Sequence, residues 1–530
     1  MPVPSIIHAY SVLRKSLSLL LLVFVTKGAL AKGPDPAARI PLEPLGFQTL
    51  PTQFLLAGSS MFTVDFVDEK HLLLTYSTKR LLKRLPDCPA GDQDRVIDAV
   101  LLEVPSGKVL GRTSWRTHDR GQYLWSLGQG RFMLRVRNTL TTFAPMVNLA
   151  KGDAFRERSF ITTERRIGGI LFSPDADLMI LETMEPLPLS NDSLQPTSAI
   201  SSDEQRIRME TPVQVNFFRL IKPGGDEVDL KEGSAFRARV PGRIPANSAG
   251  YVATVDQGQQ HWAFDFHTYS GKVKELSQFN STCRPVPMLV SRGEFIAFGC
   301  GLNHSPQVIG GFNMRGEEMW QQTLPESYIA PTFAFAPRAG RFVMSRLLTH
   351  SSVVQTSDIL MPELVAGQTI VVYQTDSGRQ ILRVDAAPVS RAGQNFALAP
   401  DGMTLAVIRT DAVEVYALPT LTPRERDAVK LAESSAPQED NTPPGLFDSP
   451  IPRSDAASSA AAAAAFRDQK PPELKQVEPP ASQAPQSAVP ADTPTSSPTE
   501  SQQAPTEATP RKPPTLYSPG QEAKPEAPKQ

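Results

Sequence analysis

The chain contains few of the residues that usually carry catalysis or hold metals. Its 530 residues include three cysteines, seven histidines and four tryptophans. The sequence has no Gly-x-Ser-x-Gly elbow, no phosphate-binding Gly-x-x-x-x-Gly-Lys-Ser/Thr loop, no His-Glu-x-x-His and no Cys-x-x-Cys. An Asp-x-Asp-x-Asp-Gly calcium loop is also missing. We therefore predict no catalytic residue, no cofactor-binding residue, no cofactor and no metal ligand.

The chain also lacks a strong net charge. Its formal charge of −1 gives no bulk attraction to nucleic acid or to an anionic membrane, although a local patch would not show in that sum. We expect no nucleic-acid partner.

Long apolar runs are nearly absent, and the exception lies at the N-terminus. Arg14 and Lys15 precede an apolar run from Leu17 to Val25, and Ala29-Leu30-Ala31 follows it. A basic segment, a short apolar segment and an A-x-A site are typical of a secretory signal peptide, here residues 1–31. The alternative is a retained anchor helix, but the run is short for a bilayer. After cleavage we expect no transmembrane segment and an exported protein, periplasmic or extracellular.

Three cysteines allow at most one intrachain disulfide. Cys283 and Cys300 lie at the two ends of a predicted hairpin that turns at Ser291-Arg292-Gly293. Folding this hairpin brings the two sulfur atoms together, so we predict a Cys283–Cys300 disulfide, which suits an oxidising compartment. Cys88 then remains an unpaired thiol. The alternative is that Cys283 and Cys300 are two unpaired buried cysteines.

Short apolar runs separated by tight turns fill residues 60–418. In residues 395–418, one run reaches Ala399-Pro400-Asp401-Gly402, a second turns at Thr410-Asp411, and a third alternates through Val413 and Val415. Alternation with period 2 between turns rich in Gly, Asp and Ser is typical of antiparallel strands. Similar units begin near residues 62, 122, 168, 249, 286 and 332. The sequence thus contains seven copies of one unit, with six or eight as alternatives.

Such copies must stack on one another, because one small sheet cannot bury both of its faces. Without polar inserts at residues 185–210 and 350–368, the spacing approaches the forty-odd residues of a four-stranded propeller blade. We therefore predict an all-β fold, a β-propeller of about seven blades over residues 46–420, preceded by a leader at residues 32–45. The last copy has only three strands, and the apolar run Phe47 to Leu56 is predicted to supply the fourth and close the ring.

After the predicted propeller, the strand pattern ends and a different sequence pattern begins at residue 421. Thr422, Pro423 and Glu425 form a helix start, with an N-cap, a proline in the first turn and a capping-box glutamate, so a short helix is predicted over residues 421–433. Residues 434–530 are rich in Pro, Ala and Ser and poor in branched apolar residues. We expect this tail to be disordered.

The repeated phrases resemble the WD-repeat and YVTN-type β-propellers of exported bacterial proteins. The resemblance rests on Phe172-Ser173-Pro174-Asp175, on Ala399-Pro400-Asp401-Gly402, and on the turns beginning at Ser106, Ser270 and Ser377. It covers most of residues 60–418 and implies the architecture, with little about activity. The Trp-Asp and Gly-His pairs of eukaryotic WD repeats are missing.

Three sets of residues are candidates for a binding site, and each also has an ordinary structural explanation. His261, Asp265 and His267 share one face of a predicted strand, where a metal trio competes with a solvated strand face. The four tryptophans line a cofactor pocket in one interpretation and pack between blades in the other; they are Trp115, Trp125, Trp262 and Trp320. Six arginines form a basic region that is either a partner surface or ordinary solvated charge: Arg135, Arg137, Arg156, Arg158, Arg165 and Arg166.

We interpret the chain as a non-catalytic, monomeric propeller that binds a protein or glycan partner, with inserts as the binding elements. The alternative is a propeller-type hydrolase, lyase or oxidoreductase whose residues converge on a channel mouth. A third hypothesis makes the tail the functional part.

Overall fold

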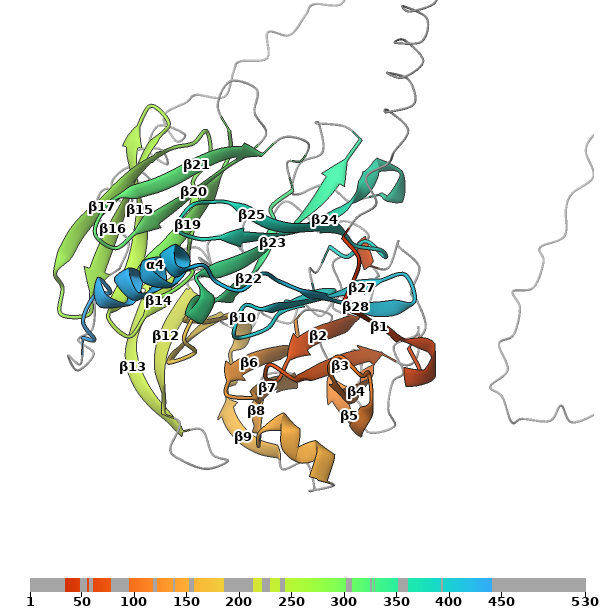
Figure 1. Ribbon diagram of the computed structural model, residues 1–530. Helices are drawn as coiled ribbons and strands as arrows, with labels where there is room; N and C mark the ends of the chain where they lie inside the picture. Colours follow the sequence, from red (N-terminus) through yellow and green to blue (C-terminus); the bar gives the residue numbers. More distant parts are fainter. Residues whose placement is uncertain are drawn as a thin grey trace, which may run out of the picture. The chain divides into compact units, whose positions relative to one another are not determined.

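Seven four-stranded antiparallel sheets make up the computed structural model, and they follow one another along the chain (Figure 1). They confirm the predicted seven-bladed, all-β propeller. The structure describes residues 34–47, 55–56, 61–77, 95–117, 122–136, 139–151, 157–184, 213–221, 229–238, 244–301, 307–324, 327, 329–350, 361–391 and 394–440. The predicted signal peptide, Cys88 and the tail beyond residue 440 lie outside these residues.

The blades match the seven sequence copies. Blade 1 contains β2 (Phe62–Phe66), β3 (His71–Ser77), β4 (Arg95–Glu103) and β5 (Val109–Thr117). Blade 2 contains β6 (Leu124–Gly128), β7 (Arg131–Val136), β8 (Thr139–Phe143) and β9 (Glu157–Thr162), with the 3-10 helix η2 (Met146–Lys151). Blade 3 contains β10 (Arg166–Phe172), β11 (Leu178–Met184), β12 (Val213–Ile221) and β13 (Asp229–Ala238). Blade 4 contains β14 (Ala246–Asn247), β15 (Gly250–Gly258), β16 (His261–Thr268) and β17 (Val273–Asn280).

The remaining blades continue the same order. Blade 5 contains β18 (Val286–Leu289), β19 (Glu294–Gly299), β20 (Gln307–Asn313) and β21 (Glu318–Leu324). Blade 6 contains β22 (Thr332–Ala336), β23 (Arg341–Thr349), β24 (Val365–Gln374) and β25 (Gln380–Asp385), with the 3-10 helices η3 (Pro337–Ala339) and η4 (Pro362–Leu364). Blade 7 contains β26 (Phe396–Leu398), β27 (Thr404–Arg409) and β28 (Ala412–Ala417), and a strand from the N-terminus completes it.

That completing strand is β1 (Ala38–Pro41), which pairs antiparallel with β28 and places Ile40 opposite Val413. A closing N-terminal strand is confirmed, but its predicted location at Phe47 to Leu56 was wrong. The predicted leader at residues 32–45 contains the real strand and the 3-10 helix η1 (Glu43–Leu45). Pro41 is tolerated because β1 is an edge strand and the last residue needs no ladder N–H.

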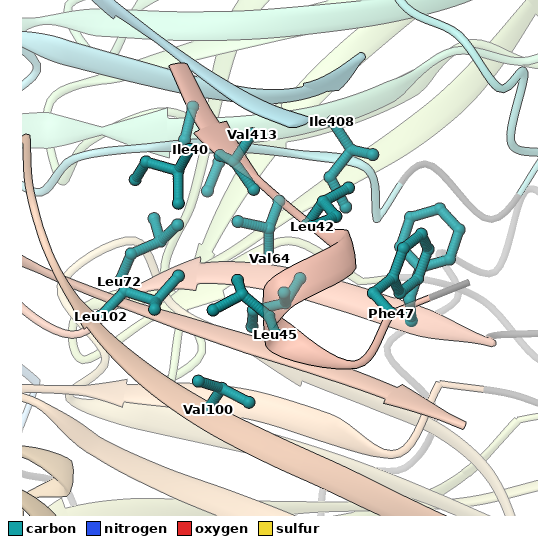
Figure 2. Packing of buried hydrophobic residues seen from close by; sticks show 14 of the residues in the cluster. Ile40, Leu42, Leu45, Phe47, Val64, Leu72, Val100, Leu102, Ile408 and Val413 are labelled. Atoms are coloured by element: carbon teal, nitrogen blue, oxygen red, sulfur yellow. The ribbon is translucent and has the colours of Figure 1, made fainter. Parts of the chain in front are cut away.

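Phe47 is apolar, as a buried strand residue would be, but it contributes to the core from a loop. It is buried and meets Phe62 and Tyr76 edge to face, with ring centroids 5.6 and 5.4 Å apart. Figure 2 shows Ile40, Leu42, Leu45 and Phe47 packed among residues of blades 1 and 7. The N-terminal segment therefore joins the first blade to the last.

Apolar contacts hold every pair of neighbouring blades together. A separate buried cluster lies at each of the seven junctions, from blades 7 and 1 around to blades 6 and 7. The stacking that the repeats require is thus achieved by side chains on both faces of each sheet.

The helix after the ring is α4 (Pro423–Ser434), and its capping box is present as predicted. Thr422 Oγ1 accepts a hydrogen bond from the Glu425 amide, and the Glu425 carboxylate accepts one from the Thr422 amide (2.7 Å). The expected insert at residues 350–368 is shorter than predicted, because β24 already begins at Val365. Among the described residues, no helix is long and apolar enough to cross a membrane.

Candidate functional site

The two ends of the propeller carry different connections. In an antiparallel blade, the connections from the first to the second strand and from the third to the fourth lie at one end, and the others lie at the opposite end. One end has the turns at residues 174–177, 290–293 and 337–340. Residues 419–440, described below as the strap, cross this end, so we call it the strap face. The opposite end, with the connections at residues 78–94, 185–212 and 350–364, is called the insert face.

The insert face receives the three longest connections between strands. Each links the second strand of a blade to the third: β3 to β4, β11 to β12, and β23 to β24. Their central parts lie outside the described residues, but the strands that flank them fix the end of the propeller from which they leave. The polar inserts predicted from the sequence therefore share one face.

A disulfide also lies on the insert face. Cys283 follows β17, Cys300 follows β19, and their sulfur atoms are 2.08 Å apart. The bond connects two loops of this face in blade 5, and the hairpin that predicted it is the antiparallel pair β18 and β19. Ser281 Oγ reinforces the junction, because it accepts the Cys300 amide (3.0 Å) and donates to the Cys283 carbonyl (2.6 Å).

The first strand of each blade lies nearest the axis of the ring, where β26 contacts both β2 and β22. Within the described first strands, only Asp65 and Arg166 are charged. Burial raises the pKa of Asp65 to about 6, and a hydrogen bond from Thr63 opposes this shift. The Thr63 hydroxyl also lies 2.8 Å from that of Thr75, which lies 2.6 Å from the Tyr123 hydroxyl. Asp65 thus lies at the end of a chain of hydroxyl groups that runs from blade 1 to Tyr123, just before blade 2.

The strap face is crossed by residues 419–440, which comprise α4 and its flanks and which we call the strap. At its start, Arg341 donates to the Pro419 carbonyl (2.7 Å), and Glu425 pairs with Arg379 (2.5 Å). The helix then passes η3 of blade 6, beside β22 (Figure 1).

The end of the strap lies over blades 5, 4 and 3. Glu439 pairs with Arg292 (3.1 Å). The Ser270 amide donates to Asp440 Oδ2 (2.6 Å), and Arg219 donates to the Asp440 carbonyl. The strap therefore spans from blade 7 to blade 3.

Charges from distant blades converge beneath the strap. Burial raises the pKa of Asp175 in blade 3, and the nearby negative charge of Asp177 raises it further. Arg292 of blade 5 and Arg338 of blade 6 lower it, while Glu433 of the strap raises it. These influences agree with the contacts that place the strap across this face, from blade 6 to blade 4.

The structure does not bring the proposed metal trio together. His261, Asp265 and His267 all lie on β16, and no group of three or more His, Cys, Asp or Glu that could hold a metal ion occurs among the described residues. The His267 ring stacks on Tyr251 with centroids 5.0 Å apart. Burial lowers the pKa of His267, and the negative charge of Asp265 opposes that change.

The tryptophans lie in separate parts of the ring rather than around one pocket. Trp115 stacks on Phe143 of the next blade (5.5 Å), and Trp320 stacks on Phe342 (6.3 Å). Trp125 packs against the cluster between blades 2 and 3, and the Trp262 indole donates to the Ser281 carbonyl (3.0 Å).

Three arginines of the predicted basic region bind within blades 2 and 3. Arg135 donates to the Ile167 carbonyl (3.3 Å), Arg165 to Thr183 Oγ1 (3.1 Å) and Arg166 to Met184 Sδ (3.4 Å). Arg137, Arg156 and the Arg158 side chain lie outside the described part of the chain. These contacts give three of the six arginines a structural role.

A shallow open groove of about 570 Å³ lies elsewhere, along the outer strand β21, where Gln321, Gln322 and Thr323 line it. Its described lining consists of two amides and a hydroxyl group. The sequence interpretation missed Asp65 and the converging strap-face charges. Alignment of the seven copies would have marked Asp65, because the first strands β6, β14, β18, β22 and β26 are uncharged.

No protein-family model and no curated protein matches the chain. Among solved structures, it is similar to an acylaminoacyl peptidase of Pyrococcus horikoshii, with TM-score 0.40 and 11% identity over 68% of this chain and 51% of the other. An oligogalacturonate lyase in complex with manganese matches with TM-score 0.33 and 10% identity over 68% and 97%. A putative TolB from Agrobacterium tumefaciens matches with TM-score 0.31 and 11% identity over 62% and 100%.

Proposed function

We propose that this protein is an exported, non-catalytic propeller that binds a protein or glycan partner through its insert face. One observation carries the proposal: the three longest connections leave the same end of the ring, while the strap crosses the other end. Loops positioned by a rigid scaffold are the usual place for binding residues. The Cys283–Cys300 disulfide on the same face supports export, since such bonds persist in oxidising compartments.

A photo-crosslinking experiment tests this placement. Met361 in the insert at residues 350–364 is 56% exposed, and Leu431 on the strap is 49% exposed. A photoreactive amino acid at each position, in the full chain in its native envelope, provides a matched pair. We expect a discrete adduct from position 361 and none from position 431. Adducts from position 431 alone would contradict the proposal.

An enzyme with a site at a channel mouth is the second candidate. It is favoured by the titratable side chains of the strap face that influence Asp175. We prefer binding to catalysis because the charges around Asp175 are of both signs and because the strap crosses this face. The test is the Asp175→Asn variant: loss of a hydrolytic or lyase activity detected in the wild type, with the fold retained, would favour the enzyme.

A further inference from the structure

We propose that the surface beneath the strap is a docking site for a short helix with acidic residues at both ends, and that the strap is its cis occupant. We call this surface the strap seat; it comprises Arg219, Ser248, Ser270, Arg292, Gly293, the segment 338–340 and Arg379. The proposal is independent of binding at the insert face. It predicts that an acidic helix from another molecule competes with the strap.

The strap is docked on the ring rather than built into its core. Only Glu425 and Ala432 are buried among the twelve residues of α4, and Leu431 is half exposed. A helix that stabilises a fold normally buries an apolar stripe. By contrast, the closing strand β1 buries Ile40 in the cluster between blades 1 and 7. The part of the strap from α4 onward can therefore detach without opening the clusters between blades.

Recognition of the strap depends on its acidic groups. Arg379 of blade 6 binds Glu425 near the helix start, and Arg292 of blade 5 binds Glu439 beyond its end. The Ser270 amide of blade 4 binds the carboxylate of Asp440. These donors lie on three blades and are spaced along the strap, so they recognise a segment with carboxylates at both ends. A basic peptide would meet the same arginines with repulsion.

The seat is also shaped for a helix backbone. A Cβ atom added at Gly293 would lie 2.0 Å from the Ala432 carbonyl oxygen, and one at Gly340 would lie 2.9 Å from Val429 Cγ2. The glycines thus allow the last turns of α4 to approach the blade 5 and blade 6 turns closely. Ala432 itself is only 6% exposed, so a ligand in trans needs a small residue at the position that it occupies.

Lifting the strap would expose the strap seat. Because residue 441 continues directly from the strap, anything that binds and pulls the following chain acts first on the Glu439 and Asp440 contacts. The Arg292–Glu439 pair is partly exposed, with 31% and 50% of the two side chains accessible. Exposed ion pairs are weak, so this end is the one that detaches first.

A peptide-binding experiment tests the docking site. In the full chain, Ala432→Arg unseats the strap while leaving the seat unchanged, and Leu431→Arg is the matched control on the exposed side of the helix. A fluorescent peptide of residues 419–440 should bind the Ala432→Arg protein about tenfold or more tightly than the wild type or the control, because the cis competitor is removed. The same peptide with Glu425→Lys and Glu439→Lys should lose binding. Equal peptide binding to all three proteins, or none to Ala432→Arg, would overturn the proposal.

A second measurement is available should Ala432→Arg prevent folding. Gly293→Ala pushes against the Ala432 carbonyl, whereas Gly367→Ala is a control with no atom within 4 Å of the added methyl group. Amide hydrogen exchange in residues 426–434 should become about tenfold faster in Gly293→Ala and stay unchanged in Gly367→Ala. Unchanged amide exchange in Gly293→Ala would contradict the proposal, because it would show that the close contact between Gly293 and Ala432 does not hold the strap on the seat.

Discussion

Removing the side chain of Ile40 should destabilise the whole ring. Ile40 is 3% exposed and lies on β1, the four-residue strand that completes blade 7, within the cluster that joins blades 7 and 1. A Cβ atom added at Gly107 would lie 3.0 Å from Ile40 Cγ2, so the Ile40 side chain is tightly packed. Truncating a buried isoleucine to alanine costs 2–5 kcal/mol, and we expect about 3 kcal/mol for Ile40→Ala because an edge strand can partly relax.

The neighbouring residue provides the control. Arg39 lies on the same strand but points outward, and its ion pair with Asp411 (2.5 Å) is formed by two exposed side chains. Arg39→Ala should therefore change the free energy of unfolding much less than Ile40→Ala. Guanidinium denaturation followed by tryptophan fluorescence measures both. If the two variants unfold at the same denaturant concentration, β1 does not close the ring by burying Ile40.

Three further perturbations have expected outcomes. Burial and the charge of Asp376 raise the pKa of Glu294 from 4.5 to about 7, so the stability that this carboxyl contributes is present below pH 4.5 and lost as pH rises through 7. Glu294→Gln should leave stability unchanged at pH 4 and raise it by up to about 3 kcal/mol at pH 8 in chemical denaturation; a loss at pH 8 would contradict this. Replacing Cys283 and Cys300 by serine opens a loop with a sequence separation of 17 and should cost about 3 kcal/mol, whereas an unchanged thermal midpoint would argue against it. Val415→Pro removes a ladder N–H from β28 between two strands, so unfolding at the wild-type midpoint would refute its role in ring closure.

The local patterns of the sequence predicted most of the fold. Each blade consists of adjacent strands whose alternation and turn residues lie within a few dozen positions, so the seven copies could be recognised without tertiary information. The turns around Gly107, Gly271 and Gly378 adopt the positive φ expected of them. The start of α4 was also predictable, because the Thr422 and Glu425 capping box depends on residues only three positions apart.

The sequence by itself thus determined that the chain forms seven stacked blades, a capped helix and a disulfide-bonded hairpin, because each depends on contacts between residues close in the chain. Only the tertiary structure decided which N-terminal segment closes the ring. Edge pairing depends mainly on backbone hydrogen bonds, so a short strand ending in Pro41 could take the place that the apolar run from Phe47 was expected to fill. Tertiary structure also decided where α4 lies, because Arg379, Arg292 and Ser270 come from three blades and meet the strap only after the ring has closed.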